Sequence, residues 1–431
     1  MESHKAPRLV RQPPVGPDRE LIPQPEFGGL VKSRRVALGM TQRDLACPGL
    51  SMSYISLLES GQRHPTRGAV QALSAQLKVD PEYFLAEIRP EPSTESTDVV
   101  RRIVNSLTMA AVGEDRLAEA GLREVLAAPD TPPAVGWQAK WELAQLLHST
   151  AHRDARVELL DLINDPASQD TPLVKALAYV MLAHAEREYG ALRQAMQYAR
   201  SALQEHTAVS SGGAADTLHA RALTQLIAAL CELGEVEQAQ PLAEELAGIV
   251  DNVQTPEARA MGQSAIAHAL MRGGDHTRGR VHQDLALREL SVEADVRLWG
   301  RLRKSAVTVA LDTHPEPDVA RLSDLLDEAT HALTLVGTAA DRLEVSTNAA
   351  ALDLLREHPQ EAVRKVSEAL ERTSDASGWD LGRAHLVLAR AHRSLGEADA
   401  AAADYRAAAD DFERAGAYQR ALAVWRESVP Q

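Results

Sequence analysis

The sequence predicts an all-α protein in which a small helical domain precedes a long array of helix pairs. Only 3% of the 431 residues are aromatic, and alanine is abundant within a hydrophobic fraction of 45%. This composition favours close helix packing over sheets, which are rich in aromatic and β-branched residues. Amphipathic segments also recur along the chain, separated by short Gly, Pro or acidic turns. A chain of this length is too long for one compact core.

The first 26 residues predict a disordered, Pro-rich arm, because six prolines occur there without apolar periodicity. Arg8 and Arg11 either touch DNA or belong to a tail without a role, since basic arms are recognisable only at higher charge density. A second break, at residues 89–97, combines prolines with small polar residues and predicts an exposed linker. We therefore expect one domain at residues 27–88 and another at 98–431.

The first domain is predicted to contain five helices, two of them short and joined by a tight turn. The residues that cap or break these two helices are Gly39, Thr41, Pro48, Gly49, Ser51 and Gly61. They predict one helix that begins at Thr41 and breaks at Pro48, and a second from Met52 to Ser60. An amphipathic helix over residues 67–78 is expected to supply the apolar surface on which these two helices pack. This is the geometry that inserts a second helix into the major groove of DNA.

At this point the residues resemble the phage-repressor-like helix-turn-helix family, also called the XRE family, over about 60 positions. The motifs that carry the resemblance are Arg35-x-x-x-Gly39, Thr41-Gln42-x-x-Leu45-Ala46, Ser53-Tyr54-Ile55-Ser56 and Glu59-x-Gly61-x-x-x-Pro65. The resemblance implies an internal ion pair between Arg35 and Glu59. It also implies that Gln42 bonds phosphate or an adjacent base, and that Met52, Ser53 and Ser56 face base edges. The candidate DNA-contacting residues are Gln42, Ser51, Met52, Ser53, Tyr54, Ser56, Arg63 and Arg67.

The chain departs from the family pattern at the turn and at the first residue of the recognition helix. The turn Cys47-Pro48-Gly49 is one residue shorter than in the phage repressors, and Met52 replaces a frequent glutamine. Met52 offers only apolar contact, for instance to a thymine methyl group, or else packs within the domain. Arg63 and Arg67 are placed to meet phosphates, with ordinary solvated arginines as the alternative.

The charge distribution restricts DNA binding to the first domain. The formal net charge is −15, and a uniformly acidic surface repels phosphates. Residues 1–88 carry eleven Lys and Arg against nine Asp and Glu, whereas the remainder carries 35 against 52. The expected nucleic-acid partner is therefore a double-stranded operator bound by the N-terminal part.

Several other classes of protein find no support in the sequence. Cys47 and Cys231 are the only cysteines and have no CxxC partner, which argues against a disulfide framework or a zinc site. We find no apolar run of membrane-spanning length and no secretory leader, so we expect a cytoplasmic protein that does not enter a membrane. Phosphate-cradle, zinc-protease and nucleophile-elbow motifs are missing, so no catalytic residue, metal or cofactor is expected.

The region 98–431 predicts an α-solenoid of six to eight helix pairs, because turns recur about every 40 residues. These turns are Glu188-Tyr189-Gly190, Glu232-Leu233-Gly234-Glu235, Gly273-Gly274-Asp275, His314-Pro315, His358-Pro359 and Ser394-Leu395-Gly396-Glu397. The segment from Leu381 to Gly416 resembles a tetratricopeptide repeat, and other copies are weaker. Small residues at the motif's offsets allow the two helices of a pair to approach closely. Armadillo-like helices are the structural alternative.

The concave face of such an array is lined by the first helix of each pair, and the repeat offsets nominate its residues. They are His184, Arg187, His268, Arg301, Lys304, Asn348, Arg383, Arg390 and Arg393. Basic and amide side chains in an acidic region favour an anionic or peptide ligand, because Arg forks onto carboxylates and Asn both donates and accepts. Solvated surface residues are the alternative.

The order of domains resembles the RRNPP-type peptide-pheromone receptors. That resemblance implies quorum sensing by a homodimer on a roughly palindromic operator, with a signalling peptide in the groove. Our hypothesis from the sequence is a ligand-gated transcription factor. The alternative is an interaction scaffold whose repeats hold a partner protein while DNA binding localises the complex.

Overall fold

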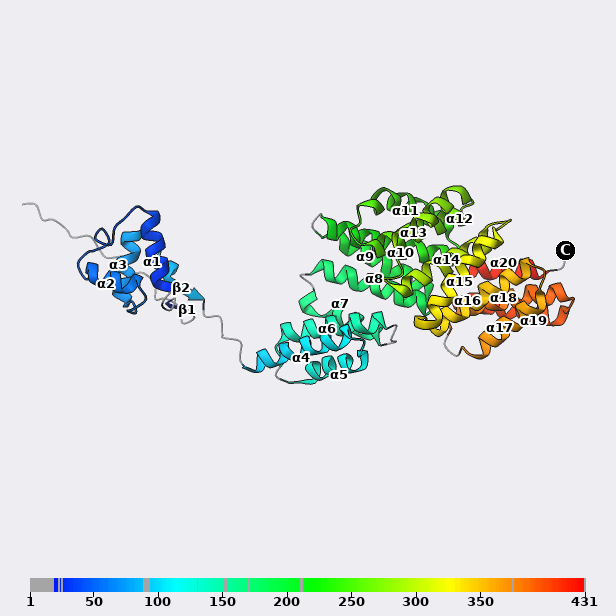
Figure 1. Ribbon diagram of the computed structural model, residues 1–431, viewed down its shortest axis with the longest axis horizontal. Coiled ribbons are helices and arrows are strands. Elements are labelled where there is room, and N and C mark those ends of the chain that lie inside the picture. Colours follow the sequence, from blue (N-terminus) through cyan, green and yellow to red (C-terminus); the bar gives the residue numbers. More distant parts are fainter. Residues whose placement is uncertain are drawn as a thin grey trace, which may run out of the picture. The chain divides into compact units, whose positions relative to one another are not determined.

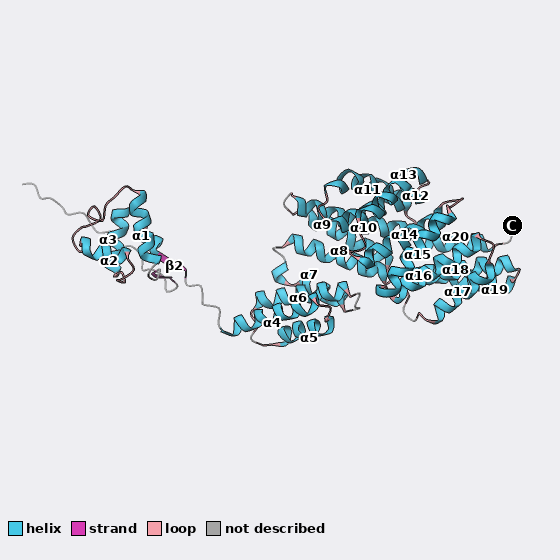
Figure 2. Cartoon of the chain, viewed as in Figure 1, coloured by secondary structure: helices cyan, strands magenta, loops and turns pink. Residues whose placement is uncertain are grey.

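The computed structural model describes residues 19–21, 24, 26–87, 94–129, 131–150, 154–168, 171–209, 212–373 and 376–429. The chain forms two compact units, Met1–Thr97 and Asp98–Gln431 (Figure 1). Figure 2 shows helices in both units and strand only in the first, so the all-α prediction is confirmed. Residues 1–18 of the predicted arm and 88–93, which include most of the predicted linker, lie outside the described residues. Helix α4 begins at Thr94, so the last residues of that linker are helical.

The first unit is built on three α-helices. Its elements are β1 (Arg19–Leu21), α1 (Glu26–Ala37), α2 (Met52–Glu59), α3 (Arg67–Leu77), the 3-10 helix η1 (Pro81–Phe84) and β2 (Leu85–Glu87). Fully buried side chains from all three α-helices and η1 form one core that includes Phe27, Leu58, Leu73 and Phe84. The rings of Phe27 and Phe84 lie 5.0 Å apart and join the two ends of the domain.

The described residues at the end of the predicted arm, 19–21 and 24, differ from that prediction. Strand β1 pairs antiparallel with β2, with Arg19 opposite Glu87 and Leu21 opposite Leu85. The Gln24 side chain then donates hydrogen bonds to the carbonyls of Leu58 (3.1 Å) and Arg63 (2.7 Å). Backbone pairing needs no apolar periodicity, and the prolines at 17 and 23 flank the three paired residues rather than interrupt them.

The helix predicted to begin at Thr41 does not form. The Asp44 carboxylate accepts hydrogen bonds from the Thr41 N–H (2.7 Å) and hydroxyl (2.8 Å). The backbone N–H groups of Asp44 and Ala46 each bond to the carbonyl three residues earlier, which makes consecutive turns. These local bonds compete with an α-helix that Pro48 would in any case keep very short. The described part of this unit therefore has three α-helices and one 3-10 helix instead of five helices.

The second unit contains eight successive helix pairs and a final helix among its described residues. The pairs are α4 (Thr94–Ala111) with α5 (Asp115–Ala127), α6 (Pro133–Ser149) with α7 (Ala155–Asn164), α8 (Pro172–Glu188) with α9 (Leu192–His206), α10 (Gly213–Leu233) with α11 (Val236–Ile249), α12 (Pro256–Arg272) with α13 (His276–Glu289), α14 (Val296–Thr313) with α15 (Val319–Val336), α16 (Ala339–Leu355) with α17 (Pro359–Glu371), and α18 (Gly378–Leu395) with α19 (Ala398–Arg414). Helix α20 (Tyr418–Ser428) follows, and the 3-10 helices η2 (Pro166–Ser168) and η3 (Val250–Asn252) lie in connections. This is the predicted α-solenoid.

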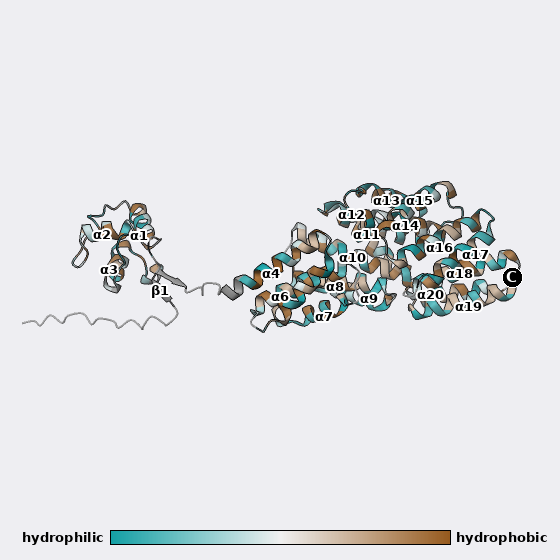
Figure 3. Cartoon of the chain, turned by 60° about the horizontal axis from the view of Figure 1, so that its bottom comes forward, coloured by the Kyte–Doolittle hydropathy of each residue, from teal (hydrophilic) through white to brown (hydrophobic). Residues whose placement is uncertain are grey.

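The first helices of successive pairs, from α8 to α18, pack on one another and form the inner layer. Figure 3 shows hydrophobic and hydrophilic residues alternating along single helices, as amphipathic packing requires. The small residues predicted at the repeat offsets are buried, among them Ala183, Ala195, Ala199 and Ala202. Their size lets α8 and α9 approach closely.

The array closes on itself instead of remaining an open groove. Leu192 and Leu233, near α8–α10, share a hydrophobic cluster with Trp379, Phe412 and Val424 from the C-terminal helices. At the turn after α8, an added Cβ on Gly190 would lie 3.0 Å from the Cβ of Ser377. The inner faces of α8 to α18 are thereby brought around one space.

Candidate nucleic-acid interface and ligand cavity

Helix α2 presents one polar face to solvent and buries the other. Ser51 caps it, because the Ser51 hydroxyl accepts a hydrogen bond from the Tyr54 N–H at 3.2 Å. Ile55 and Leu58 are fully buried, whereas Ser51, Ser53 and Ser56 are exposed and Met52 is 52% exposed. The face that sequence reasoning assigned to base edges is therefore the exposed one.

Tyr54 and Arg63 border this face. The Tyr54 hydroxyl donates to the carbonyl of His64 at 3.4 Å, and the Arg63 guanidinium lies 5.8 Å from the centre of the Tyr54 ring. Arg63 itself is exposed and lies four residues after the end of α2. Arg67 is the first residue of α3, and its side chain lies outside the described part of the structure.

Glu59 organises the base of α2. Arg35 donates to both carboxylate oxygens of Glu59, at 2.6 and 2.9 Å, which confirms the ion pair that the family resemblance implied. The side chain of Gln42 also donates to Glu59, at 2.8 Å. Burial raises the pKa of Glu59, but these hydrogen bonds outweigh it and leave the pKa below its ordinary value. Gln42 is thus held against the domain, and its contact with DNA remains a prediction.

A polar cavity lies at the centre of the second unit. Its empty space, counted together with its opening to solvent, is about 1270 Å³. Its walls come from the inner helices α8, α10, α12, α14, α16 and α18, so six successive pairs each supply part of it. Charged and polar side chains from all six of these helices reach the same space, so it can hold a polar ligand.

The structure brings five of the nine predicted ligand residues to this cavity: His184, Arg187, His268, Arg301 and Lys304. Asn348 and Arg383 are buried beside it, where Arg383 donates to the Asn348 carbonyl oxygen at 3.0 Å. Arg390 and Arg393 lie elsewhere, and both contact the Glu427 carboxylate, at 2.8 and 3.3 Å. The last two were predicted from repeat offsets, and the cavity does not include them among its lining residues.

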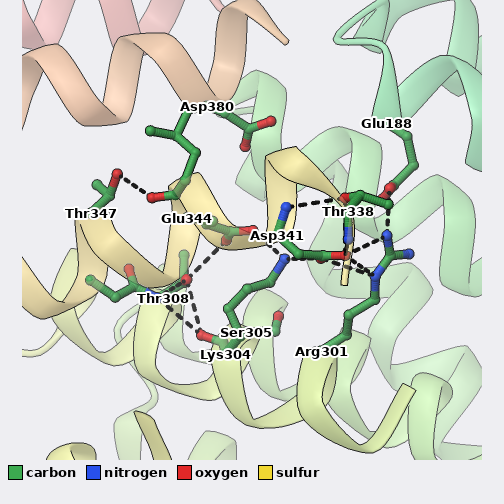
Figure 4. A network of polar contacts seen from close by, with 12 residues as sticks. Glu188, Arg301, Lys304, Ser305, Thr308, Thr338, Asp341, Glu344, Thr347 and Asp380 are labelled. Carbon is green, nitrogen blue, oxygen red and sulfur yellow. Dashed lines mark hydrogen bonds and ion pairs between the residues drawn. The ribbon is translucent and has the colours of Figure 1, made fainter. Parts of the chain in front are cut away.

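Sequence reasoning missed the acidic half of the lining. The acidic residues of the cavity wall are Glu188, Glu232, Asp341, Glu344 and Asp380. Arg301 donates to Asp341 at 3.0 Å and to Glu188 at 3.2 Å, and Lys304 contacts Asp341 at 2.8 Å (Figure 4). The signal was present in the sequence, because Glu188 follows His184 by four residues and Glu344 precedes Asn348 by four, which places each pair on one helix face.

Burial sets the protonation states in this cavity. It lowers the pKa of both His184 and His268 to about 3, so both imidazoles are neutral at pH 7. For Glu188, burial raises the pKa, but the charges of Arg301, Arg187 and Lys304 lower it to about 2. The cavity therefore holds charged pairs together with neutral histidines.

Some buried polar atoms of the cavity wall have no hydrogen-bond partner among the described residues. They are Gln225 Oε1, His184 Nδ1, Arg187 Nε and Arg272 Nε. Buried polar groups are ordinarily hydrogen-bonded, so such atoms mark places where a ligand or water can bind. No group of three or more His, Cys, Asp or Glu suited to a metal ion occurs in the described ranges. No helix within them is long and apolar enough to cross a bilayer.

Residues 31–84 match the family model named helix-turn-helix. The first unit is therefore an XRE-type helix-turn-helix domain, as its residues predicted. It is followed by a tetratricopeptide-like helical array. The search of curated proteins found no match.

Several solved structures are similar to this chain at low identity. The Bacillus thuringiensis PlcR complex with the peptide PapR7 and DNA is 15% identical, with 76% of this chain and 98% of that chain covered and a TM-score of 0.32. ComR from S. thermophilus, in complex with DNA and its signalling peptide ComS, is 11% identical, with 66% and 99% covered and a TM-score of 0.38. A Rap protein complexed with competence and sporulation factor is 12% identical, with 77% and 96% covered and a TM-score of 0.47.

Proposed function

We propose that this protein is a sequence-specific transcriptional regulator of the cytoplasm whose DNA affinity is controlled by a ligand in the cavity of the second unit. The observation that carries the proposal is the combination of a helix-turn-helix domain with an array whose six inner helices surround one polar cavity. DNA binding alone requires neither the array nor the cavity.

The exposed face of α2 supports a role in reading base edges. Ser53 and Ser56 can donate to or accept from any base, and Met52 can contact a thymine methyl group. Arg63 lies where the end of a recognition helix approaches the phosphate backbone. Ser51, Tyr54, Gln42 and Arg67 complete the proposed interface, as the capping residue, the support for Arg63 and two further phosphate contacts.

The composition of the cavity wall supports a peptide more than a purely anionic ligand. Arg187, Arg272, Arg301 and Lys304 are matched there by five acids. A peptide offers donors, acceptors and both charges, which is what such a wall can satisfy.

The test of ligand control compares two states of the full-length protein. Mass spectrometry of the natively purified protein identifies a retained low-mass ligand, and genomic fragments bound by the protein supply the operator. Gel-shift titrations then compare ligand-loaded with stripped protein. We expect the operator affinity to differ, and identical affinities in the two states would refute the proposal.

The recognition helix is tested by Ser53→Glu. The new carboxylate on the exposed face of α2 is expected to abolish specific operator binding, because it repels DNA phosphates. Ser291→Glu makes the same change of charge at an exposed position of the second unit and should bind the operator normally. Operator affinity is measured by gel shift and folding by circular dichroism. Retained affinity in Ser53→Glu would show that α2 is not the reading helix.

Homodimer formation is part of this proposal, and an exposed apolar stripe on α4 supports it. Val100, Val104 and Leu107 are 46%, 55% and 36% exposed and follow one another at helical spacing, which is the pattern of a helix seam. Two copies would carry two recognition helices to half-sites about one helical turn apart. Val104→Glu should therefore yield a monomer in sedimentation velocity, whereas Val157→Glu, at an equally exposed valine of α7, should not. Dimers of both variants would exclude α4 as the seam.

A further inference from the structure

Two successive repeats place an aspartate at the same position of their inner helices. Asp341 is the third residue of α16 and Asp380 the third residue of α18. In each helix the capping residue, Thr338 or Ser377, accepts a hydrogen bond from the aspartate N–H at 3.1 Å. The two carboxylates are therefore fixed in equivalent places on the cavity wall.

Their surroundings differ in charge. Asp341 contacts Arg301 and Lys304, the sixth and ninth residues of the preceding inner helix α14. The sixth and ninth residues of α16, which precedes α18, are Glu344 and Thr347. The repeat position that supplies Asp341 with a base thus supplies Asp380 with a second acid.

Asp380 is accordingly the one acid of the cavity wall that forms no ion pair among the described residues. Glu188 contacts Arg301 at 3.2 Å, Glu232 contacts Arg187 at 2.7 Å and Glu344 contacts Lys304 at 2.5 Å. Within the described ranges, the Asp380 carboxylate accepts a hydrogen bond only from the Ser377 hydroxyl, at 2.8 Å. Figure 4 shows Asp380 above Glu344 with no ion pair drawn to it. Burial and the charge of Glu344 raise the pKa of Asp380 to about 7, although the Ser377 hydrogen bond and the charge of Lys304 lower it, so ionisation here costs free energy.

Gln225 gives an independent sign of a missing donor. This residue of α10 lines the same cavity and is only 5% exposed. Its amide oxygen has no hydrogen-bond partner in the described part of the chain. An unsatisfied buried acceptor is stabilised by a ligand N–H, and an ammonium or guanidinium group carries only donors.

We propose that the Asp380 carboxylate, beside Glu344, is the subsite for a cationic N–H group of the ligand, an ammonium or guanidinium. The Gln225 amide oxygen accepts a further hydrogen bond from the same ligand. This inference rests on the proposed ligand control and specifies the ligand as a peptide or small molecule with a basic group. It departs from the expectation of an anionic ligand. The positions equivalent to Arg301 and Lys304, which pair with Asp341, hold Glu344 and Thr347 beside Asp380 and supply no cation.

A pair of probes of nearly equal shape tests the subsite in the full-length protein. N-acetyl-arginine methylamide carries a guanidinium, and N-acetyl-citrulline methylamide replaces it by a neutral urea. Both are titrated at pH 8, and binding is read from the rise in melting temperature, which grows with ligand occupancy. We expect the arginine probe to raise the melting temperature and the citrulline probe to raise it much less.

Asp380→Asn is expected to lower the affinity for the arginine probe by about tenfold or more, because a charge-assisted hydrogen bond is lost. The two probes should then raise the melting temperature equally. Asp399→Asn removes the same charge from an exposed position of α19 and should preserve the difference. Equal binding of the two probes to the wild type, or unchanged arginine binding in Asp380→Asn, would overturn the inference. The measurement uses no DNA, so an operator affinity indifferent to ligand would count against the proposed function alone.

Discussion

At the residue scale, folding and ligand binding favour different protonation states of Asp380. The folded protein without ligand is more stable when the carboxyl is protonated, whereas the proposed cationic ligand binds the ionised carboxylate. The Asp380 pKa of about 7 lies above that of an aspartate in an unfolded chain, so between those values the folded state binds more protons. The stability that this group contributes is complete at low pH and is lost as the pH rises towards 7. A carboxylate that destabilises the fold is retained where it serves a site.

Asp380→Asn should therefore raise the free energy of unfolding at pH 8 and leave it nearly unchanged at pH 4, because asparagine imitates the protonated acid. Urea unfolding of both proteins across this range gives the difference. The comparison with wild type is essential, since His184 and His268, with pKa values of about 3, make stability rise with pH between about 3 and 6.5. A difference that stays constant with pH would show that Asp380 is not buried as described.

The sequence identified single site residues only where a pattern fixed their direction. Helical spacing placed Ser53 and Ser56 on the exposed face of α2, and repeat offsets found His184 and Arg301 on the cavity wall. Offsets specify a helix face but not the partner across it, which is why Asp380 was missed. What distinguishes Asp380 is that an acid, Glu344 of α16, lies beside it. That fact can be used only when the two residues are known to be neighbours in space.

At the scale of elements, the packing of α1 on α2 depends on one glycine. A Cβ on Gly28 would lie 2.2 Å from the Leu58 carbonyl oxygen, far closer than van der Waals contact allows. The obstacle is backbone, so no rotamer change can relieve it.

Gly28→Ala is expected to destabilise the first unit by about 1–3 kcal/mol and to abolish operator binding. Gly29→Ala is the matched control, because a Cβ there meets nothing within 4 Å. Calorimetry should show the melting of the small domain shifted and that of the array unchanged. Equal melting of the two variants would mean that α1 and α2 pack less closely than the structure shows.

Local bonding decided the elements that the sequence mispredicted. Thr41 was expected to cap a helix, but the side chain of Asp44 bonds back to it and closes a turn. The pairing of β1 with β2 joins residues far apart in sequence and uses backbone groups only, so it leaves no side-chain pattern. The repeat helices were predicted more reliably because their length and amphipathic period reinforce each other.

At the scale of the whole array, the periodic sequence predicted a solenoid but not its closure. Closure depends on contacts such as Arg301 with Glu188, 113 residues apart, and Leu192 with the cluster around Phe412. A repeat pattern describes only contacts between neighbouring pairs. The residues that close the array occupy positions that are not shared by every repeat, so the pattern cannot reveal them.

Asp312 ties the end of the array together. This residue of α14 is nearly buried and contacts Arg420 of α20 at 3.1 Å, Arg272 of α12 at 3.4 Å and Arg383 of α18 at 3.6 Å. Burial raises its pKa, but these three guanidinium groups hold the pKa well below its usual range. One carboxylate thus contacts three guanidinium groups from three helices, of which Arg383 also contacts Glu344 at 3.6 Å.

Asp312→Asn should consequently destabilise the array by about 3–5 kcal/mol, the cost of leaving buried charges without their partner. Asp399→Asn, at the exposed site on α19, is expected to change the free energy of unfolding by less than about 0.5 kcal/mol. Denaturant unfolding followed by circular dichroism gives both values. Hydrogen exchange should in addition speed up first in α18 and α20, because Asp312 holds these two C-terminal helices to α14. If both variants unfold at the same denaturant concentration, the three arginines must be compensated elsewhere, and closure of the array would rest on its apolar cluster alone.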